Sequence, residues 1–208
     1  MKRDLVIFDF DGTLADSLSW LMSVIDEVAD RYRFRRLDRG ALGTLRGADI
    51  WDVLEHHRVP RWRAPWVARH LRERMHREIG RIRLFPGIEQ VLQHLADSGA
   101  RLALASSNSR GNVTSVLGPH AALFSHLECG ASIGGKASRL RRVLKASRVP
   151  AARAWYIGDE IRDARAAAQA GIAFGAVGWG YTQVQALLAH GAAASFASAE
   201  ELLGKLLE

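Results

Sequence analysis

Short apolar segments alternate with stretches of helical periodicity along most of the chain. The apolar segments are followed by glycine, serine or aspartate residues, which is typical of buried parallel strands. We predict strands at residues 5–10, 101–105, 124–129, 154–157 and 172–177, and a weaker strand at 194–196. Helical patterns occur at residues 88–96, 110–117, 161–170, 183–189 and 199–207, and another helix begins near Lys136. This alternation predicts an α/β fold, a doubly wound parallel sheet with helices on both faces.

One long stretch after the first predicted strand shows no strand-like alternation. Residues 16–84 are helical in pattern, and glycine and proline residues divide them into about four short helices, the first capped by Asp16 or Ser17. We therefore predict a core formed by residues 1–15 and 85–208, with a helical cap, residues 16–84, inserted into it. Within the cap we expect Trp51, Trp62 and Trp66 in its core and His56 and His57 on a solvated helix face.

Two carboxylates follow the first predicted strand. Asp9 and Asp11 are spaced i, i+2, so both are expected to project from the same face at the strand's C-terminal end. Ligands of open α/β sheets bind at this edge, and two like charges this close require a cation or a shared proton. The pair therefore indicates a divalent metal site, whereas an Asp-rich turn would explain the two residues taken alone.

More polar residues stand at the ends of later strands and at a helix start. Ser106 follows the second strand, Asp159 and Asp163 follow the fourth, and Lys136 begins a helix. In a doubly wound sheet these positions share one edge, and together they suggest phosphoryl transfer. One carboxylate can accept the phosphoryl group, a second can exchange protons, Mg²⁺ suits carboxylate ligands, and a lysine neutralises phosphoryl oxygens.

These segments resemble the motifs of the haloacid dehalogenase (HAD) superfamily of phosphatases. The four motifs correspond to residues 9–17, residues 102–106, Lys136 and residues 158–163, the last reading GDxxxD. The predicted cap stands where the family has a C1 cap, and residues 178–181 resemble the phosphoglycolate phosphatase-like branch. The resemblance implies a Rossmannoid core and an Mg²⁺-dependent phosphatase that hydrolyses a small phosphomonoester through an aspartyl-phosphate intermediate.

The resemblance also implies roles for the acidic residues. Asp9 would be the nucleophile and Asp11 the general acid/base. Mg²⁺ would be held by the Asp9 carboxylate, the Asp11 backbone carbonyl and Asp159. Asp163 would either support the metal through water or orient Lys136, which binds the phosphoryl group.

The phosphate-binding residues are implied in the same way. Gly12 would let the chain turn and Thr13 would brace the loop. The Ser106 hydroxyl and the backbone of Ser107 and Asn108 would bind the remaining phosphoryl oxygens.

Comparison with the residues typical of other branches of the superfamily narrows the expected reaction. Dehalogenases lack the second aspartate, which is present here as Asp11. Phosphonoacetaldehyde hydrolases need a cap lysine, and residues 16–84 contain none. Beta-phosphoglucomutase-like enzymes carry a histidine early in the cap, where this chain has Leu21. A phosphatase is therefore expected, with a HAD-type phosphomutase or another phosphotransferase as the alternative.

The charge of the chain bears on its partners. The net charge is +7 and the pI about 10.3, and residues 16–84 hold fifteen arginines against ten acidic residues. We expect a small anionic phosphorylated metabolite, with Arg46 of a cap loop contacting it, although solvated arginine is an equal alternative. A basic nucleic-acid-binding protein and a catalytically silent HAD-like interaction protein are alternatives of another class. No zinc ligands or recognition helix favour the first, and the intact aspartates argue against the second.

The cysteine count and the length of the apolar runs indicate the cellular compartment. One cysteine, Cys129, excludes an internal disulfide framework, and no apolar run is long enough for a signal peptide or membrane span. We therefore expect a cytoplasmic protein without membrane contact. The sequence predicts neither the oligomeric state nor the identity of the substrate.

Overall fold

The computed structural model describes residues 4–36, 50–130 and 135–207. Its centre is a sheet of six parallel strands in the order β3-β2-β1-β4-β5-β6. The strands are β1 (Leu5–Phe8), β2 (Arg101–Ala105), β3 (Phe124–Glu128), β4 (Ala154–Gly158), β5 (Ala173–Val177) and β6 (Ala194–Phe196). The order reverses between β1 and β4, which makes the C-terminal ends of these two strands the switch point where doubly wound sheets bind ligands.

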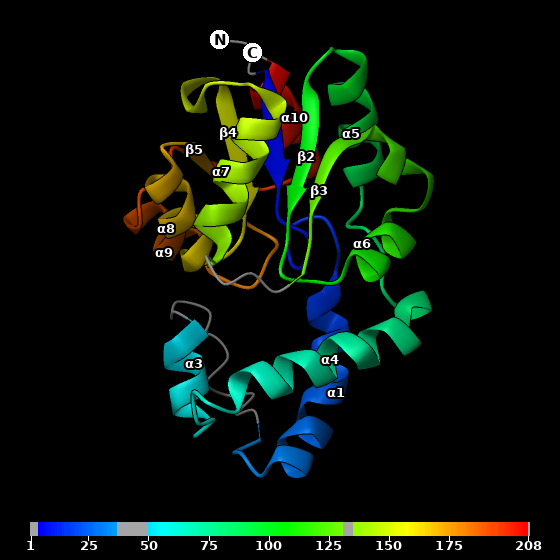
Figure 1. The fold of residues 1–208 in the computed structure, drawn as a ribbon, viewed down its shortest axis with the longest axis vertical. Helices are drawn as coiled ribbons and strands as arrows, with labels where there is room; N and C mark the ends of the chain where they lie inside the picture. The colour runs from blue at the N-terminus through cyan, green and yellow to red at the C-terminus, as the bar shows by residue number, and fades with distance from the viewer. Residues whose placement is uncertain (1–3, 37–49, 131–134, 208) are drawn as a thin grey trace.

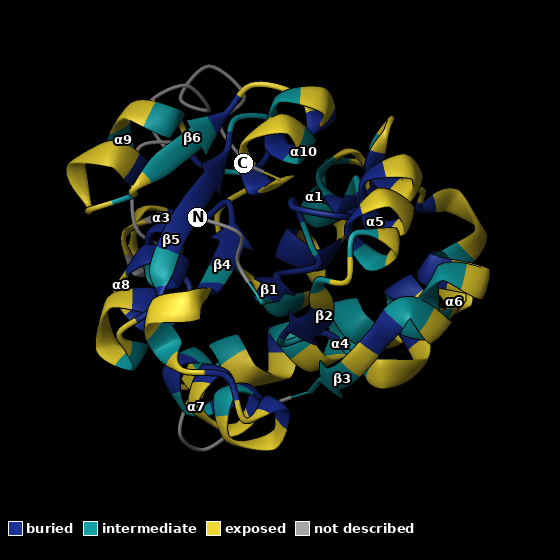
Figure 2. Ribbon diagram, turned by 90° about the horizontal axis from the view of Figure 1, so that it is seen from above, coloured by how far each residue is buried: buried dark blue, intermediate teal, exposed yellow. Residues whose placement is uncertain are grey.

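The central strands are buried on both faces because successive side chains point to opposite sides. Leu5 and Ile7 of β1 join the hydrophobic cluster under one set of helices, and Val6 and Phe8 join the cluster under the other. Figure 2 shows β1 and β5 as buried between helices whose outer faces are exposed. The predicted α/β fold class is confirmed.

Helices cover both faces of the sheet (Figure 1). One face carries α5 (Ile88–Asp97), α6 (Arg110–Leu117) and α10 (Ala199–Leu207). The other carries α7 (Gly135–Ser147), α8 (Ile161–Ala170) and α9 (Val184–Ala189). Short 3₁₀ helices lie at η2 (Ile79–Arg81), η3 (Gly118–Leu123) and η4 (Ala151–Arg153). In the described part of the chain, no helix combines the length and the apolar character needed to cross a bilayer.

Three further helices lie beyond the C-terminal ends of the strands in Figure 1, and we call them the cap helices. They are α1 (Ser17–Tyr32), α3 (Ile50–His56) and α4 (Ala64–Arg77). The Asp16 side chain caps α1 by accepting from the Ser19 backbone N–H at 3.4 Å. Trp20 and Val24 of α1 and Met75 of α4 join the hydrophobic cluster on one face of the sheet, so burial of apolar surface holds α1 and α4 against the rest of the molecule.

Some cap side chains lie elsewhere than expected. Trp62 and Trp66 are 67% and 55% exposed, so their expected place in a cap core is wrong. Each ring lies beside a guanidinium group, whereas Val67, one position further along α4, turns inward. The Trp51 side chain lies outside the described residues.

Of the two histidines expected on a solvated helix face, only one is exposed. His56 is exposed, as expected, but His57 is buried, with Nδ1 at 3.2 Å from the Arg35 carbonyl. Burial lowers the pKa of His57 below its usual value. The His57 ring therefore serves packing and a backbone contact rather than solvation.

Candidate active site

The loop after β1 is built around a glycine in the left-handed conformation. The backbone N–H of Thr13 donates to the Phe10 carbonyl, and Gly12 has a φ of 77°. A Cβ at Gly12 would also clash with the Asp159 carboxylate, so glycine is required twice over. Thr13 Oγ1 donates to Asp159 Oδ1 at 2.8 Å, and Trp179 Nε1 donates to the Thr13 carbonyl at 3.0 Å. The loop of the first motif is thereby fixed to the end of β4.

Asp9 lies directly after β1 and faces a buried lysine. Its backbone N–H donates to the Ile157 carbonyl at 2.8 Å, and only 3% of the residue is exposed. Lys136 Nζ lies 2.6 Å from Asp9 Oδ2 and also pairs with Asp163 Oδ1. Tyr156 Oη donates to the same Asp163 oxygen at 3.1 Å. Lys136 is therefore held between two aspartates, a contact that matches the orienting role considered for Asp163.

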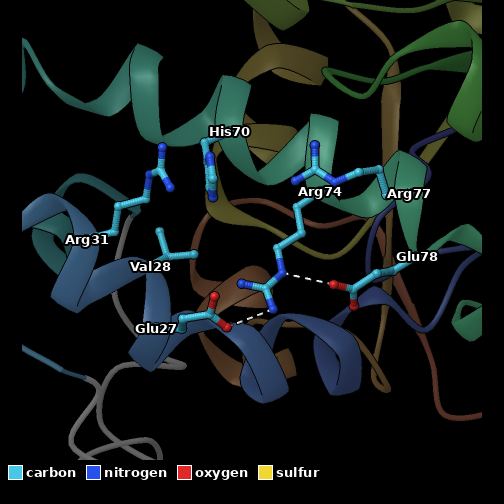
Figure 3. A pocket seen from close by; sticks show the side chains of 7 residues that line it. All are labelled: Glu27, Val28, Arg31, His70, Arg74, Arg77 and Glu78. Atoms are coloured by element: carbon cyan, nitrogen blue, oxygen red, sulfur yellow. Dashed lines mark hydrogen bonds and ion pairs between the residues drawn. The ribbon is translucent and has the colours of Figure 1, made fainter.

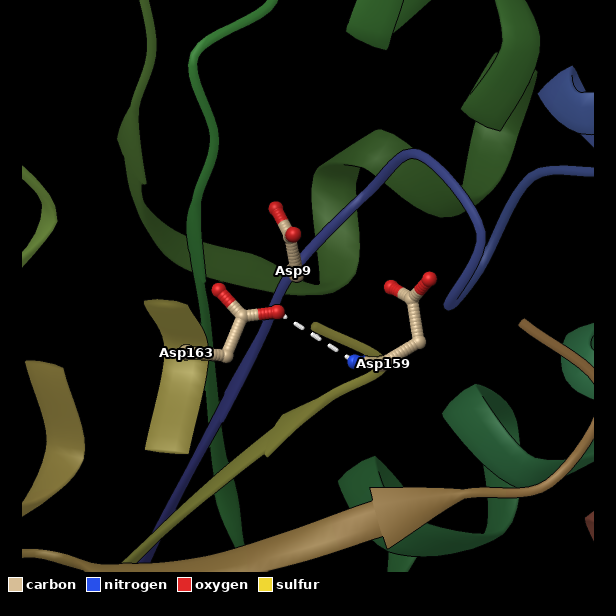
Figure 4. A group of neighbouring side chains, drawn as sticks. All are labelled: Asp9, Asp159 and Asp163. Atoms are coloured by element: carbon tan, nitrogen blue, oxygen red, sulfur yellow. Dashed lines mark hydrogen bonds between the residues drawn. The ribbon is translucent and has the colours of Figure 1, made fainter. Parts of the chain in front are cut away.

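Three buried aspartates form a possible metal site, shown in Figure 4. One carboxylate oxygen from each of Asp9, Asp159 and Asp163 lies within 4.8 Å of the others. Burial, reinforced by the neighbouring carboxylates of Glu160, Asp163 and Asp9, raises the pKa of Asp159 well above its usual value. Oxygen donors are the ligands of Mg²⁺, and the three carboxylates outnumber the two cations beside them, Lys136 and Arg162. The residues present therefore fit a divalent cation.

The pKa values of Asp9 and Asp163 shift in opposite directions. Burial raises the pKa of Asp9 to about 6, although Lys136 opposes this rise. For Asp163, the positive charges of Lys136 and Arg162 outweigh the burial penalty, so its pKa lies below the usual value. Asp163 is thus the firmly ionised partner of the lysine.

Asp11 accepts hydrogen bonds from an amide side chain and is not one of the three clustered aspartates. Asn108 Nδ2 donates to both oxygens of the Asp11 carboxylate, at 3.1 and 3.0 Å. Burial, followed by the negative charge of Asp9, raises the pKa of Asp11 to about 6, against the Ser17 hydroxyl and the Asn108 amide. A carboxyl with such a pKa exchanges protons readily near neutral pH.

The predicted phosphate-binding residues lie in the loop after β2 and at the start of α7. Ser106 is buried, and its Oγ accepts from the Asn108 backbone N–H at 3.0 Å. Ser107 is partly exposed beside them. Lys136 opens onto the same edge through its contact with Asp9. Arg46 lies outside the described residues.

Sequence reasoning missed residues that shape the site from the loop after β5. The Tyr181 backbone N–H donates to Asp159 Oδ2 at 2.8 Å, and Tyr181 Oη lies 2.7 Å from Ser17 Oγ. A Cβ at Gly180 would clash with Asp159, so this loop needs glycine to approach the carboxylate. The second glycine of the pattern Gly-Trp-Gly-Tyr, Gly180, was the available signal, but one sequence does not show that Asp159 is the residue it approaches.

A charged groove lies between two of the cap helices, α1 and α4 (Figure 3). It has a volume of about 320 Å³ and lies between Arg31 of α1 and His70, Arg74 and Arg77 of α4. Arg74 pairs with Glu27 at 2.8 Å, whereas Arg31 and Arg77 form no ion pair with any described residue. Burial and these arginines lower the pKa of His70. Part of the arginine excess of the cap is therefore concentrated in this groove.

Known proteins share this combination of fold and site. The profile described as haloacid dehalogenase-like hydrolase matches residues 6–177, which include the four motifs at residues 9–17, 102–106, 136 and 158–163. The chain therefore belongs to the haloacid dehalogenase-like hydrolase family, and the resemblance seen in its motifs is confirmed.

Individual relatives narrow the comparison. The chain is 32% identical to phosphoglycolate phosphatase of Synechococcus elongatus over 190 residues, which cover 88% of either chain. It is 31% identical over 192 residues to tyrosine-protein kinase PtkA of Mycobacterium tuberculosis, covering 85% of this chain and 62% of PtkA. The crystal structure of a predicted phosphatase from Clostridium acetobutylicum has a TM-score of 0.83 and 22% identity, covering 100% of this chain and 99% of that one. This last likeness supports the fold.

Proposed function

We propose that the chain is an Mg²⁺-dependent phosphatase that hydrolyses a small organic phosphomonoester through an aspartyl-phosphate intermediate. One observation carries the proposal: the buried Asp9 carboxylate pairs with Lys136 and has an oxygen within 4.8 Å of one of Asp159, while Asp11 accepts hydrogen bonds from Asn108. Such a reaction needs a nucleophile, a group that exchanges protons, and positive charge to balance the phosphoryl oxygens. Asp9 and Asp11 would be the first two, and Lys136 together with a bound Mg²⁺ ion would supply the charge.

The metal would be held by the Asp9 carboxylate, the backbone carbonyl of Asp11 and the carboxylate of Asp159. When bound, Mg²⁺ neutralises charge on the phosphoryl oxygens. Asp163 is engaged by Lys136, so we assign it to orienting that lysine rather than to direct coordination. Thr13 and the Tyr181 backbone N–H direct the Asp159 carboxylate.

The chemistry divides into two displacements. A carboxylate oxygen of Asp9 attacks phosphorus, the bond from phosphorus to the ester oxygen breaks, and protonated Asp11 gives its proton to the departing alkoxide. Asp11, now ionised, takes a proton from a water molecule as that water attacks the phosphoryl group. The acyl phosphate bond then breaks, inorganic phosphate leaves, and both aspartates return to their starting states.

The loop after β2 and Lys136 would bind the phosphoryl group. The Ser106 hydroxyl and the backbone of Ser107 and Asn108 would donate to its oxygens, and the Lys136 ammonium would balance its charge. Gly12 allows the turn that brings Asp9 and these donors to one place.

We assign substrate choice to residues 16–84 as a separate cap domain, with Arg46 contacting an anionic second group of the substrate. The phosphoglycolate phosphatase relative and the arginine-rich cap support a phosphomonoester that also carries a carboxylate. Arg46→Ala should raise KM for such a substrate and leave p-nitrophenyl phosphate turnover unchanged. Equal losses on both substrates would refute the contact.

The test is phosphate release from a panel that includes 2-phosphoglycolate and p-nitrophenyl phosphate, with Mg²⁺ and with EDTA. Asp9→Asn should abolish release. Asp97→Asn is the matched control, since Asp97 is an exposed aspartate on α5 that bonds to Gln93. Full activity in Asp9→Asn, or no release from any substrate, would contradict the proposal.

A phosphotransferase is the second candidate, supported by the 31% identity to a protein named as a tyrosine kinase. The same covalent step would serve it if an acceptor hydroxyl replaced water. Transfer of labelled phosphate from a donor to tyrosine-containing protein or to a sugar alcohol, at the expense of inorganic phosphate, would favour this candidate.

A further inference from the structure

Asp11 is connected to cap helix α4 through two amide side chains, Asn108 and Asn112, which we call the amide pair. Asn108 Nδ2 donates to both Asp11 oxygens, as described above. Its Oδ1 accepts from Asn112 Nδ2 at 2.9 Å and from the Ser109 backbone N–H at 2.8 Å. The amide plane of Asn108 is thereby fixed on both ends, so the direction of its donor toward Asp11 is set.

Asn112 makes the connection to the cap. It lies on α6, is fully buried, and its Nδ2 donates to the Arg72 carbonyl of α4 at 3.1 Å. Its Oδ1 lies 3.1 Å from His76 Nδ1, and because a carbonyl oxygen only accepts, that ring nitrogen carries the proton. Both donors and the acceptor of Asn112 are therefore used, and two of the three bonds reach α4.

Helix α4 also contacts Asn108, the other member of the amide pair. Met75 Sδ lies 3.0 Å from Asn108 Nδ2 and packs in the core cluster. In Figure 1 the C-terminal part of α4 lies next to α6. Cap helix, amide pair and Asp11 thus form one continuous set of contacts.

We propose that Asn112 is a positioning residue: it holds Asn108 against Asp11 only while α4 is docked on α6, so that the cap and the proton-carrying carboxylate are coupled. The proposal rests on the proposed function for the role of Asp11. Without Asn112 the Asn108 amide can rotate, and the Arg72 carbonyl loses a donor. Because Asn112 acts through Asn108, removing both should cost no more than removing Asn108 alone.

A double-mutant cycle on p-nitrophenyl phosphate hydrolysis tests this coupling. Asn108→Ala and Asn112→Ala should each lower kcat by about tenfold to a hundredfold, the range for a misplaced reacting group, with KM changed by less than about twofold. The double variant should match Asn108→Ala. Val113→Ala, which shortens the next, equally buried side chain on α6, should lower stability and leave kcat unchanged. Multiplying losses in the double variant, or an equal kcat loss in Val113→Ala, would overturn the proposal.

Hydrogen exchange separates this proposal from the proposed function. Amides of α4 around Arg72 and His76 should exchange faster in Asn112→Ala and Asn112→Asp than in Val113→Ala, because the tie between α4 and α6 is lost. Unchanged α4 exchange would overturn the link to the cap, whatever the activity. An unmodified chain that hydrolyses nothing would instead refute the proposed function, while the exchange result would still decide the link.

Discussion

Removing the charge of Asp9 should stabilise the metal-free protein, and increasingly so as the pH rises. The pKa of Asp9 is raised by burial from 3.8 to about 6 in the folded protein. Between these two values the unfolded chain ionises first, so the wild-type protein loses stability as the pH rises through this window. Each pKa unit corresponds to about 1.4 kcal/mol, so ionised Asp9 costs roughly 3 kcal/mol at pH 7.5. Asp9→Asn does not ionise and avoids this cost.

The assay is thermal and urea unfolding of wild type and Asp9→Asn in EDTA, from pH 4 to pH 7.5. The free energy of unfolding of Asp9→Asn, relative to wild type, should rise by about 2.5 kcal/mol across this range, because a small part of the cost is already present at pH 4. For a chain of this size that corresponds to a relative shift in Tm of roughly 5–10 °C. Asp9→Ala should show the same pH dependence at a different absolute stability, because only the titration carries it.

Magnesium should reverse this difference. A divalent cation favours the ionised carboxylate, so saturating Mg²⁺ at pH 7.5 should raise the Tm of wild type more than that of Asp9→Asn. A stability difference that stays constant with pH in EDTA, or one that falls as the pH rises, would refute the reasoning from burial of the Asp9 carboxylate.

Three further substitutions test residues that contact the clustered aspartates. Lys136→Met leaves two buried carboxylates without their cation and should destabilise the protein by about 3–5 kcal/mol in urea unfolding; a loss below about 1 kcal/mol would contradict this. Gly180→Ala places a Cβ against Asp159 and should weaken Mg²⁺ binding in calorimetry. Its control, Gly111→Ala, meets no neighbour on α6 and should stabilise by about 0.5–1 kcal/mol. Thr13→Val should lower kcat/KM about tenfold while Thr13→Ser keeps it near wild type; similar values for both would exclude a role for the hydroxyl.

The parallel sheet and the meeting of its polar ends were predictable from the sequence. The central strands β1, β2, β4 and β5 are mostly apolar and stop at polar or glycine residues, and parallel strands bring those stops to one edge. Asp9 and Asp159 follow the strands β1 and β4, which are neighbours at the switch point, so their approach needed no knowledge of side-chain packing.

Contacts that depend on packing between distant elements were not predictable. Asn108 was expected to use its backbone, but its side chain is what holds Asp11. His57 was expected in solvent, yet tertiary packing in the cap buries it, and Trp62 was expected in the cap interior, yet it is exposed. Periodicity indicates which face of a helix is apolar, but it does not show which neighbour covers that face.

The first strand also ends earlier than predicted. β1 stops at Phe8, although we predicted a strand as far as Phe10, because the Phe10 carbonyl accepts the N–H groups that close the loop. Phe10 is still fully buried. Hydrophobicity therefore predicted its burial correctly and its secondary structure wrongly.

Calorimetric titration of Mg²⁺ into the unmodified chain and into Asp159→Asn at pH 7.5, followed by phosphate release from 2-phosphoglycolate and p-nitrophenyl phosphate, tests the central claim most directly. We predict one Mg²⁺ site in the unmodified chain, phosphate release that requires it, and loss of both in Asp159→Asn. Metal-independent release, or Mg²⁺ binding that survives the loss of this carboxylate, would contradict the account.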